Sequence, residues 1–464
     1  MAYLKFDRTQ MTNLQDSLFK EFLITNQSGA YCSTTLVGCN IRKYHGLLVG
    51  PVPAIDDENH VLLSSLDETV IQHGAEFNLG LHKYQGENYS PKGHKYIVSF
   101  EWDKVPTWTY RIGGVLLKKE ICFRSDHFRL YIRYTLLEAH SATTLRLKPY
   151  LAFRSVRHWT QENGKANTAY QPIENGLKMC LYEGYPELFM QTDAPCTYHH
   201  EPNWYKGLDY PKERERGYYS SEDLLVPGYL EMPITKGQSI IFTASLREKE
   251  PAILKSLMEE EMAKAAPHDS LYHCLVHAAH QFRVQKEGEE YILAGYPWFK
   301  SRARDLFIAL PGLTLSIGET EAFETYMRTA EKYGDYKLHV EWRWVGEGTN
   351  SGIFQRVQEG DKIWPESIEV QLCSGKAGDY VMLGGSKISD IECKGEFPVK
   401  KRNGDFEKPI GEWNTAEIIC EGKTVKVYIN GQLQNQCTGE NTEGYIALQS
   451  EGGPIEFRNI YLTK

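Results

Sequence analysis

The amino-acid sequence predicts a mainly β protein that is interrupted once by a short helical section. Up to about residue 270, short apolar segments such as KYIVSFEW (95–102) are separated by clusters of Gly, Pro and Asn, which are typical of turns. Between about 271 and 332, apolar residues recur every three or four positions, as they do in amphipathic helices. From Tyr333 onward the period falls to two, which is the spacing of half-buried strands.

The N-terminal section, residues 1–270, is predicted to be a large antiparallel β-sandwich. Its strand-like segments carry the alternation and the β-branched and aromatic residues that pleated sheets favour. A long series of such segments suggests two packed sheets rather than a helical protein. The segments include HVLLSSLDETVIQ (60–72), TYRIGGVLLKKEICF (109–123), FRLYIRYTLL (128–137) and SIIFTASL (239–246).

The helical section is predicted to contain three helices, over 270–284, 304–318 and 322–330. Three histidines fall at helical spacing in the first of them, but a solvated helix face explains this spacing better than a metal site does. They are His273, His277 and His280.

The C-terminal section, residues 333–464, is again predicted to consist of strands. In YKLHVEWRW (336–344) the apolar residues alternate with His339, Glu341 and Arg343. Asn430-Gly431 lies between two alternating segments and predicts a hairpin with a type I′ turn, which needs positive φ at both positions.

Composition and charge exclude several classes of function. The net charge is −9 and the acidic and basic residues are interspersed, so nothing attracts nucleic acid or an anionic membrane through a basic patch. No apolar run approaches the ~18 residues of a membrane span. The first residues lack the pattern of a secretion signal, so we expect a cytoplasmic protein with reduced cysteines, no metal and no cofactor. The aromatic share of 12% suits sugar binding and an ordinary all-β core equally.

Three segments of the first two thirds resemble the bacterial and archaeal type of glycogen debranching enzyme, an amylo-α-1,6-glucosidase. They are EFLITNQSGAYCSTTLVGCNIRKYHGLLV (21–49), NWYKGLDYPKERERGYYSSEDLLVPGYLE (203–231) and AGYPWFKSRARDLFIALPGLTLSIGE (294–319). The resemblance implies an N-terminal β-supersandwich followed by the start of an (α/α)6 barrel over 271–332. It also implies that Trp298, Arg304 and Asp305 bind substrate, because a guanidinium and a carboxylate side by side can hold vicinal hydroxyls.

The motifs of this resemblance also have structural explanations. Arg42 and His45 of the R-x-Y-H-G motif can form a buried hydrogen-bonded pair that ties two strands together. Glu222-Asp223 can be a polar turn. The family pattern W-F-G-R-W-G-R-D is replaced here by WFKSRARD (298–305), which has no second Trp.

The helical section is too short for the barrel that the resemblance implies. Glycosidic cleavage of this type needs two carboxylic acids that flank the bond, and in such debranching enzymes they come from later helical hairpins. One hairpin cannot close a ring of paired helices. We therefore expect the α-1,6-glucosidase site to be incomplete.

The C-terminal section resembles a second family, the concanavalin-like jelly-roll domains called 3-keto-disaccharide hydrolases. The resemblance implies a sugar-cleaving or sugar-binding sandwich that lacks its first strands here, and it implies a family that is commonly exported. The residues that carry it are YGDYKLHVEWRW (333–344), GTNSGIFQR (348–356), IWPESIEVQL (363–372), GEWNTAEIIC (411–420), VKVYINGQL (425–433) and EGYIALQSEGGPIEFRNIYL (443–462).

In that family a ketone at C3 acidifies the C2–H bond, so a base can remove the proton and expel the C1 substituent. Glu369 is the first candidate base, and His339 and Glu341 are the second. Strand periodicity predicts that these side chains point away from the core onto a concave polar face. The candidates for donors and substrate-binding groups are Arg343, Asn350, Ser351 and Gln371.

Three hypotheses of function follow. The first is a glycoside hydrolase that acts through residues 333–464 and binds α-glucan through its N-terminal part, with carbohydrate as its partner. The second is a carbohydrate-binding protein without chemistry. The third is a chimeric fusion of two truncated genes, joined near Tyr333.

Overall fold

The structure is a computed structural model of the chain, and it describes residues 2–86, 88–125, 127–286, 289–300, 303–319, 331–359, 364–449 and 455–464. Contacts between residues divide the chain into two compact units, Met1–Ala309 and Leu310–Lys464.

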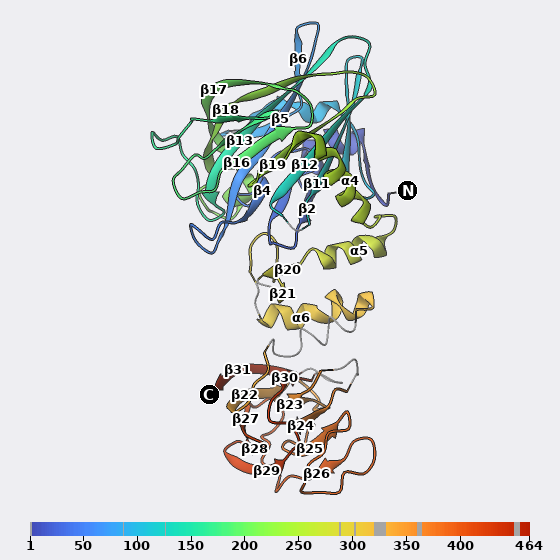
Figure 1. The fold of residues 1–464 in the computed structure, drawn as a ribbon, viewed down its shortest axis with the longest axis vertical. Coiled ribbons are helices and arrows are strands. Elements are labelled where there is room, and N and C mark those ends of the chain that lie inside the picture. Colours follow the sequence, from blue (N-terminus) through green and yellow to red (C-terminus); the bar gives the residue numbers. More distant parts are fainter. Residues whose placement is uncertain are drawn as a thin grey trace. The chain divides into compact units, whose positions relative to one another are not determined.

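The first unit is built from two large antiparallel sheets (Figure 1). In the described residues the first sheet has nine strands, which are in spatial order β1 (Leu4–Asp7), β9 (Ile97–Trp102), β10 (Pro106–Ile112), β11 (Val115–Phe123), β12 (Arg129–Glu138), β19 (Ser239–Ser245), β16 (Leu188–Thr192), β15 (Gly176–Met179) and β14 (Gln171–Ile173). The described part of the second sheet has ten strands, which are β2 (Glu21–Thr25), β3 (Tyr31–Thr35), β4 (Gly46–Pro51), β5 (Asn59–Gln72), β13 (Thr143–Ser155), β18 (Ser221–Ile234), β17 (Thr197–Asp209), β7 (Leu81–Tyr84) and β8 (Asn88–Lys92), with β6 (Ala75–Asn78) paired to β5.

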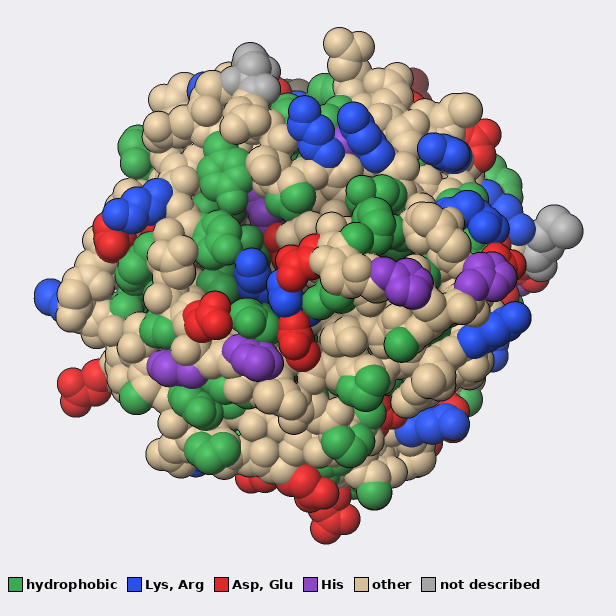
Figure 2. Space-filling view, turned by 90° about the horizontal axis from the view of Figure 1, so that it is seen from above, with side chains coloured by type: hydrophobic (Ala, Val, Ile, Leu, Met, Phe, Trp, Pro, Cys, Tyr) green, Lys and Arg blue, Asp and Glu red, His purple; other side chains and the backbone are tan. Residues whose placement is uncertain are grey.

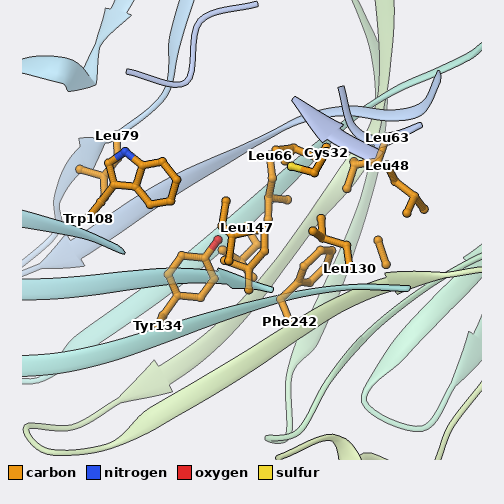
Figure 3. Close-up of a cluster of buried hydrophobic side chains, with 14 of the residues drawn as sticks. Cys32, Leu48, Leu63, Leu66, Leu79, Trp108, Leu130, Tyr134, Leu147 and Phe242 are labelled. Atoms are coloured by element: carbon orange, nitrogen blue, oxygen red, sulfur yellow. The ribbon is translucent and has the colours of Figure 1, made fainter. Parts of the chain in front are cut away.

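The core of the first unit lies between these two sheets (Figure 3). Trp108, Tyr134 and Phe242 enter it from the first sheet, and they meet Leu63 and Leu147 from the second. Each fully buried apolar side chain of this size stabilises the fold by about 1.5–3 kcal/mol relative to exposure. The alternating segments therefore become strands because one face of each can be buried against the opposite sheet.

The helices in the described residues are few and short. The segment predicted over 270–284 is helical only over Leu271–His280, which is α5, because the chain turns after His280 into a small hairpin. The segment predicted over 304–318 forms α6, and the one predicted over 322–330 lies outside the described residues. The described helices and this hairpin are α1 (Arg8–Thr12), α2 (Leu14–Ser17), α3 (Pro211–Glu215), α4 (Leu254–Lys264), α5 (Leu271–His280), α6 (Ala303–Leu313), β20 (Arg283–Lys286) and β21 (Glu289–Ile292).

The second unit contains two smaller antiparallel sheets. In its described residues the first has five strands, which are β29 (Gln432–Thr438), β28 (Thr424–Ile429), β27 (Asn414–Glu421), β22 (Tyr336–Trp344) and β31 (Ile455–Thr463). The other sheet also has five described strands, which are β26 (Val399–Lys400), β25 (Tyr380–Leu383), β24 (Ser367–Gln371), β23 (Gly352–Val357) and β30 (Tyr445–Leu448).

One apolar core joins the two sheets of the second unit. Val340 and Trp342 of β22 lie in the same buried cluster as Ile368 and Val370 of β24. The predicted hairpin is also present, because Asn430 and Gly431 have φ values of 49° and 79° between β28 and β29. Both units are thus antiparallel sandwiches, and the mainly β prediction is confirmed.

The surface carries charges of both signs. On the face drawn in Figure 2, Lys and Arg side chains are interspersed with Asp and Glu side chains. In the described part of the chain, no helix is both long enough and apolar enough to cross a membrane.

Candidate functional site

The R-x-Y-H-G motif of the first unit forms an ionic cluster around Glu21. Arg42 donates to both carboxylate oxygens of Glu21, from Nε at 2.8 Å and from Nη2 at 3.0 Å. His45 Nε2 lies 2.8 Å from Glu21 Oε2, and His45 Nδ1 accepts from the Ile41 N–H. Arg42 and His45 therefore bind a shared carboxylate on β2 rather than each other, and the motif fastens the segment before β4 to the sheet edge.

This cluster makes the stability of the first unit depend on pH. Burial alone would raise the pKa of Glu21, but the bonds from His45 and Arg42 outweigh it and lower that pKa from 4.5 to about 2. A lowered carboxyl pKa contributes stability that is present above pH 4.5 and is lost as the pH falls toward 2. We expect Glu21→Gln to be less stable than wild type at pH 7, with a difference that shrinks between pH 4.5 and 2.

Urea unfolding at pH 7, 5 and 3 measures this difference. Burial also lowers the pKa of His45, and Glu21→Gln removes the carboxylate that opposes this shift, so protonation of His45 below pH 6.5 costs the variant more stability than wild type. The test of Glu21 is therefore the change at lower pH: a gap between wild type and Glu21→Gln that does not shrink from pH 5 to 3 contradicts the assignment.

Glu222 of the second motif lies in a buried ion pair, so the interpretation of Glu222-Asp223 as a polar turn is wrong. Arg154 donates to both carboxylate oxygens of Glu222, from Nε to Oε1 and from Nη2 to Oε2, the latter at 3.0 Å. The Tyr210 hydroxyl donates to the same carboxylate at 2.6 Å. The Thr160 N–H completes the set at 3.1 Å. Asp223 accepts from the backbone of Gly207 and Glu162. Sequence alone gave no sign of this network, because its members are far apart along the chain.

Trp298 is packed against the R-x-Y-H-G motif. The Arg42 guanidinium lies 5.5 Å from the centroid of the Trp298 ring, and the Tyr44 ring meets it edge-on at 6.3 Å. The Trp298 carbonyl accepts from Arg157 Nη2 at 3.0 Å. The Trp298 indole thus stacks on the Arg42 guanidinium of the same chain. Arg304 and Asp305 belong to α6, and their side chains lie outside the described residues.

The candidate residues of β22 lie on the outer face of their sheet and are engaged with one another. The His339 ring stacks on Tyr461, with centroids 4.7 Å apart and planes inclined by 13°. Glu341 accepts from Asn459 Nδ2 at 2.8 Å and from Arg458 Nε at 2.6 Å, and these two bonds lower its pKa.

Arg343 belongs to the same polar network. Its Nε donates to Glu456 at 2.6 Å. The Trp413 ring is approached by two guanidinium groups, Arg343 at 4.7 Å and Arg458 at 3.8 Å from its centroid. Carboxylates and cations on this face are therefore paired with each other.

Glu369 lies on a different surface, the outer face of the other sheet. It pairs in register with Phe354 on β23 and with Val381 on β25, and only 3% of it is exposed. Phe354 lies 6.3 Å from the Trp364 ring, and Trp364 lies 6.1 Å from Phe397. The carboxyl group is thus set in an apolar, partly aromatic surface. We call this surface the Glu369 face; it comprises Phe354, Trp364, Glu369, Val381, Leu383, Phe397, Tyr445 and Ala447.

Gly352 makes room for this carboxyl group. A Cβ atom at Gly352 would lie 2.1 Å from Glu369 Oε1 and 2.7 Å from its Cγ and Cδ. Such distances are far inside van der Waals contact, so a side chain here forces Glu369 to move. The GTNSGIFQR segment thus supplies the space in which the candidate base lies.

The remaining candidates surround this strand pair. The Ser351 hydroxyl is buried and donates to the Gln449 carbonyl at 2.6 Å, which is a structural bond. Gln371 is half-buried, and its Oε1 accepts from the Cys373 N–H at 2.9 Å. Asn350 is half-buried just before β23. Among the described residues, no group of three or more His, Cys, Asp or Glu could hold a metal ion.

The structure therefore divides the predicted set into two groups that do not meet. His339, Glu341 and Arg343 lie outside one sheet, whereas Glu369 and Gln371 lie outside the other, with the apolar core between them. Alternation within each strand identified the outward side chains correctly but could not tell which sheet a strand joins. Sequence reasoning did not find the aromatic residues around Glu369. A signal was present in GTNSGIFQR, because Phe354 follows the core residue Ile353 and must therefore point to the opposite face of β23.

Three family models match this chain. Residues 20–241 match the N-terminal domain of glycogen debranching enzyme, and residues 276–339 match amylo-α-1,6-glucosidase. Residues 314–463 match the 3-keto-α-glucoside-1,2-lyase-like domain. The last two ranges overlap over 314–339, which includes the predicted join near Tyr333.

Individual relatives cover parts of the chain. A 3-keto-disaccharide hydrolase of Bacteroides thetaiotaomicron is 28% identical over 179 residues, covering 28% of this chain and 59% of that relative. A carbohydrate-binding module of Bacillus subtilis is 13% identical over 29% of this chain and 78% of its own, with a TM-score of 0.23. A bacterial glucoamylase complexed with acarbose is 10% identical over 53% of this chain and 34% of its own, with a TM-score of 0.28.

The matches to the first unit and to the second are thus to different families, both of them named for reactions of carbohydrates. The chain resembles glycogen debranching enzymes in its N-terminal part and 3-keto-disaccharide hydrolases in its C-terminal part.

Proposed function

We propose that the protein is carbohydrate-active and that its C-terminal unit acts on a sugar with a ketone at C3, with Glu369 as the base. The observation that carries the proposal is the position of Glu369, a nearly buried carboxyl group set in an apolar and aromatic face. Such a face suits the C–H side of a pyranose ring, and the carboxylate can then approach a carbon-bound proton. Residues 314–463 match a family named for a reaction of this kind.

The reaction on this face is an elimination. The carboxylate of Glu369 takes the proton from C2, and the electron pair of that bond forms an enolate with the C3 ketone. The enolate collapses to a C1=C2 double bond and the restored ketone as the C1–O bond breaks, and the leaving oxygen takes a proton from water. The hydroxide that remains adds to C1, and Glu369 returns its proton to C2, which gives the products of hydrolysis and restores the carboxylate. The Gln371 amide lies two residues from Glu369 along β24, on the same side of the strand, and we propose that it donates to the enolate oxygen that develops at C3.

For the N-terminal unit we propose binding of an α-glucan without α-1,6-glucosidase activity. The support is the match of residues 20–241 to the debranching family. The match to amylo-α-1,6-glucosidase spans 276–339, where the helices in the described residues are α5 and α6 together with a short 3₁₀ helix. On the grounds of these family matches we also propose three domains: the N-terminal β-sandwich over 1–270, the start of the helical barrel over 271–332, and the jelly roll over 333–464.

Turnover of a p-nitrophenyl 3-keto-α-glucoside at pH 7 tests the C-terminal proposal, after subtraction of the spontaneous elimination. We expect release of nitrophenol by wild type and a decrease of about 10²–10⁴-fold in Glu369→Gln, which is the usual contribution of a general base. Glu417→Gln is the matched control, because Glu417 lies on β27 in the opposite sheet.

The other results of this experiment point to a different role or a different site for the C-terminal unit, or contradict the proposal. Sugar binding without turnover favours a binding module. Loss of turnover in Glu341→Gln, with full turnover in Glu369→Gln, places the site on the β22 sheet. No turnover and no binding contradict the proposal for this unit.

A further inference from the structure

The first unit contains a cavity beside the buried Arg154–Glu222 pair. Its volume is about 300 Å³, and it opens to solvent. This volume lies at the lower end of the range of small-molecule sites, so the cavity suits one ring rather than a long ligand. Four aromatic residues line it, together with polar groups from three segments of chain. The lining residues include Asp56, His60, Phe153, Arg154, Trp159, Asn163, Tyr182 and Tyr185.

A bulge in β13 builds one wall. Leu151 pairs with Leu63 and Arg154 pairs with Val61, so two residues of β13 face a single residue of β5. Phe153, within the bulge, has a φ of 47°, which is uncommon for a residue with a bulky side chain. A bulge re-aims side chains, and here the consecutive residues Phe153 and Arg154 both line the cavity.

A chain of hydrogen bonds forms the second wall. His60 Nε2 lies 2.9 Å from Asp56 Oδ1, and His60 Nδ1 lies 2.8 Å from the Tyr185 hydroxyl. The carboxylate can only accept, so His60 Nε2 donates to Asp56, and in a neutral imidazole Nδ1 then accepts from the Tyr185 hydroxyl. The Tyr185 oxygen keeps a lone pair for a ligand hydroxyl, and burial raises its pKa to about 12, so it stays protonated.

The positive charge of Arg154 beside the cavity is already paired. Arg154 is bound by both oxygens of Glu222, so its charge is neutralised where it lies. The Asp56 carboxylate, which is bound to His60, adds a negative charge that repels an anion such as phosphate. A neutral ligand rich in hydroxyls instead finds acceptors in the oxygens of Tyr185 and Asn163.

Aromatic rings provide the apolar contacts. Tyr182 is half-exposed, and its hydroxyl accepts from Asn163 Nδ2 at 2.9 Å, which fixes the orientation of the ring. Trp159 lines the cavity and also meets Tyr219 edge-on at 6.3 Å. Because Tyr219 is 61% exposed, the aromatic surface continues from the cavity to the outside of the protein.

We propose that this cavity binds one neutral pyranose ring at the end of an oligosaccharide, and that the remainder of the chain runs past Trp159 toward Tyr219. The proposal rests on the proposed binding of α-glucan by this unit and gives that binding a location. Tyr182 supplies the stacking face, and the Asn163 Oδ1 and Tyr185 oxygens accept from hydroxyl groups of the sugar. Both N–H groups of the Asn163 amide are already bound, to Gln161 and Tyr182.

Isothermal titration of the full chain with maltotriose tests the location. We expect Tyr182→Ala to weaken binding by about tenfold or more, because the apolar contact of a whole ring is lost. Tyr182→Phe keeps the ring and should retain most of the affinity. An unchanged melting temperature of Tyr182→Ala shows that its loss of affinity is not due to misfolding. Tyr272→Ala is the matched control, since Tyr272 is 55% exposed on α5 and does not line the cavity.

The possible results separate this inference from the function on which it rests. Equal binding by wild type and Tyr182→Ala overturns the location and leaves α-glucan binding standing. No binding of maltotriose to wild type overturns both. Adenosine, a neutral ligand that also stacks on aromatic rings, serves as the comparison, and tighter binding of adenosine than of maltotriose overturns the sugar as the ligand class.

Discussion

Glu222→Gln is expected to lower the free energy of unfolding of the first unit by about 3–5 kcal/mol, the usual effect of removing one partner of a buried ion pair. The substitution is nearly isosteric, so it leaves no cavity. It does leave the Arg154 guanidinium buried, 5% exposed, without a counter-charge. It also weakens the bonds from Tyr210 and Thr160 to the same group. The shift of the first-unit transition in urea measures the effect.

Two controls distinguish the loss of stability caused by breaking the buried Arg154–Glu222 pair from the effect of removing any one charge. Glu162→Gln removes an ion pair with Lys206 whose side chains are about half exposed and screened by solvent, so it should change stability far less than Glu222→Gln does. The double variant Arg154→Met/Glu222→Leu removes both charges together and should be more stable than Glu222→Gln. A double variant that is less stable than the single one contradicts this account of the network.

Gly352→Ala is expected to reduce turnover of a 3-keto sugar by about 10²-fold while the second unit stays folded, because a shift of about 1 Å in a catalytic group has effects of this size. The added methyl group would lie 2.1 Å from Glu369 Oε1, so the carboxyl group must move. The end of a glutamate side chain can turn aside at little cost to stability. The rate at saturating substrate measures the loss, and the melting temperature checks the fold.

Gly334→Ala is the matched control for this glycine. Its added methyl group would meet only the Thr442 carbonyl, at 3.9 Å, and so should leave turnover unchanged. Full turnover by Gly352→Ala means that the position of Glu369 does not matter to the reaction, which contradicts its assignment as the base.

Local sequence patterns predicted the strands and turns well. The alternation from Tyr336 to Trp344 identified the buried face of β22, and Asn430-Gly431 identified the hairpin between β28 and β29. Both features depend on neighbours in sequence, so a short window contains their cause. The helix predicted over 270–284 ended early, at His280, because an apolar helical period does not by itself reveal where the chain turns into β20.

Features that depend on distant pairing could not be predicted. Strand periodicity gave the outward side of His339 and of Glu369 but not that their strands belong to different sheets, so both were expected on one polar face. The pairing of Arg154 with Glu222 joins positions 68 residues apart, and the bulge at Phe153 has no local signal. Such contacts follow from the register between strands, which a single sequence does not display.

The central claim is that Glu369 removes the proton from C2 of a 3-keto sugar. A 3-keto sugar without a leaving group at C1 isolates this step, because the proton can exchange with solvent while no bond to C1 breaks. In D₂O, proton NMR should show wild type and Glu417→Gln replacing the C2 proton by deuterium, and Glu369→Gln leaving it at the spontaneous rate. Exchange by Glu369→Gln as fast as by wild type would contradict the claim.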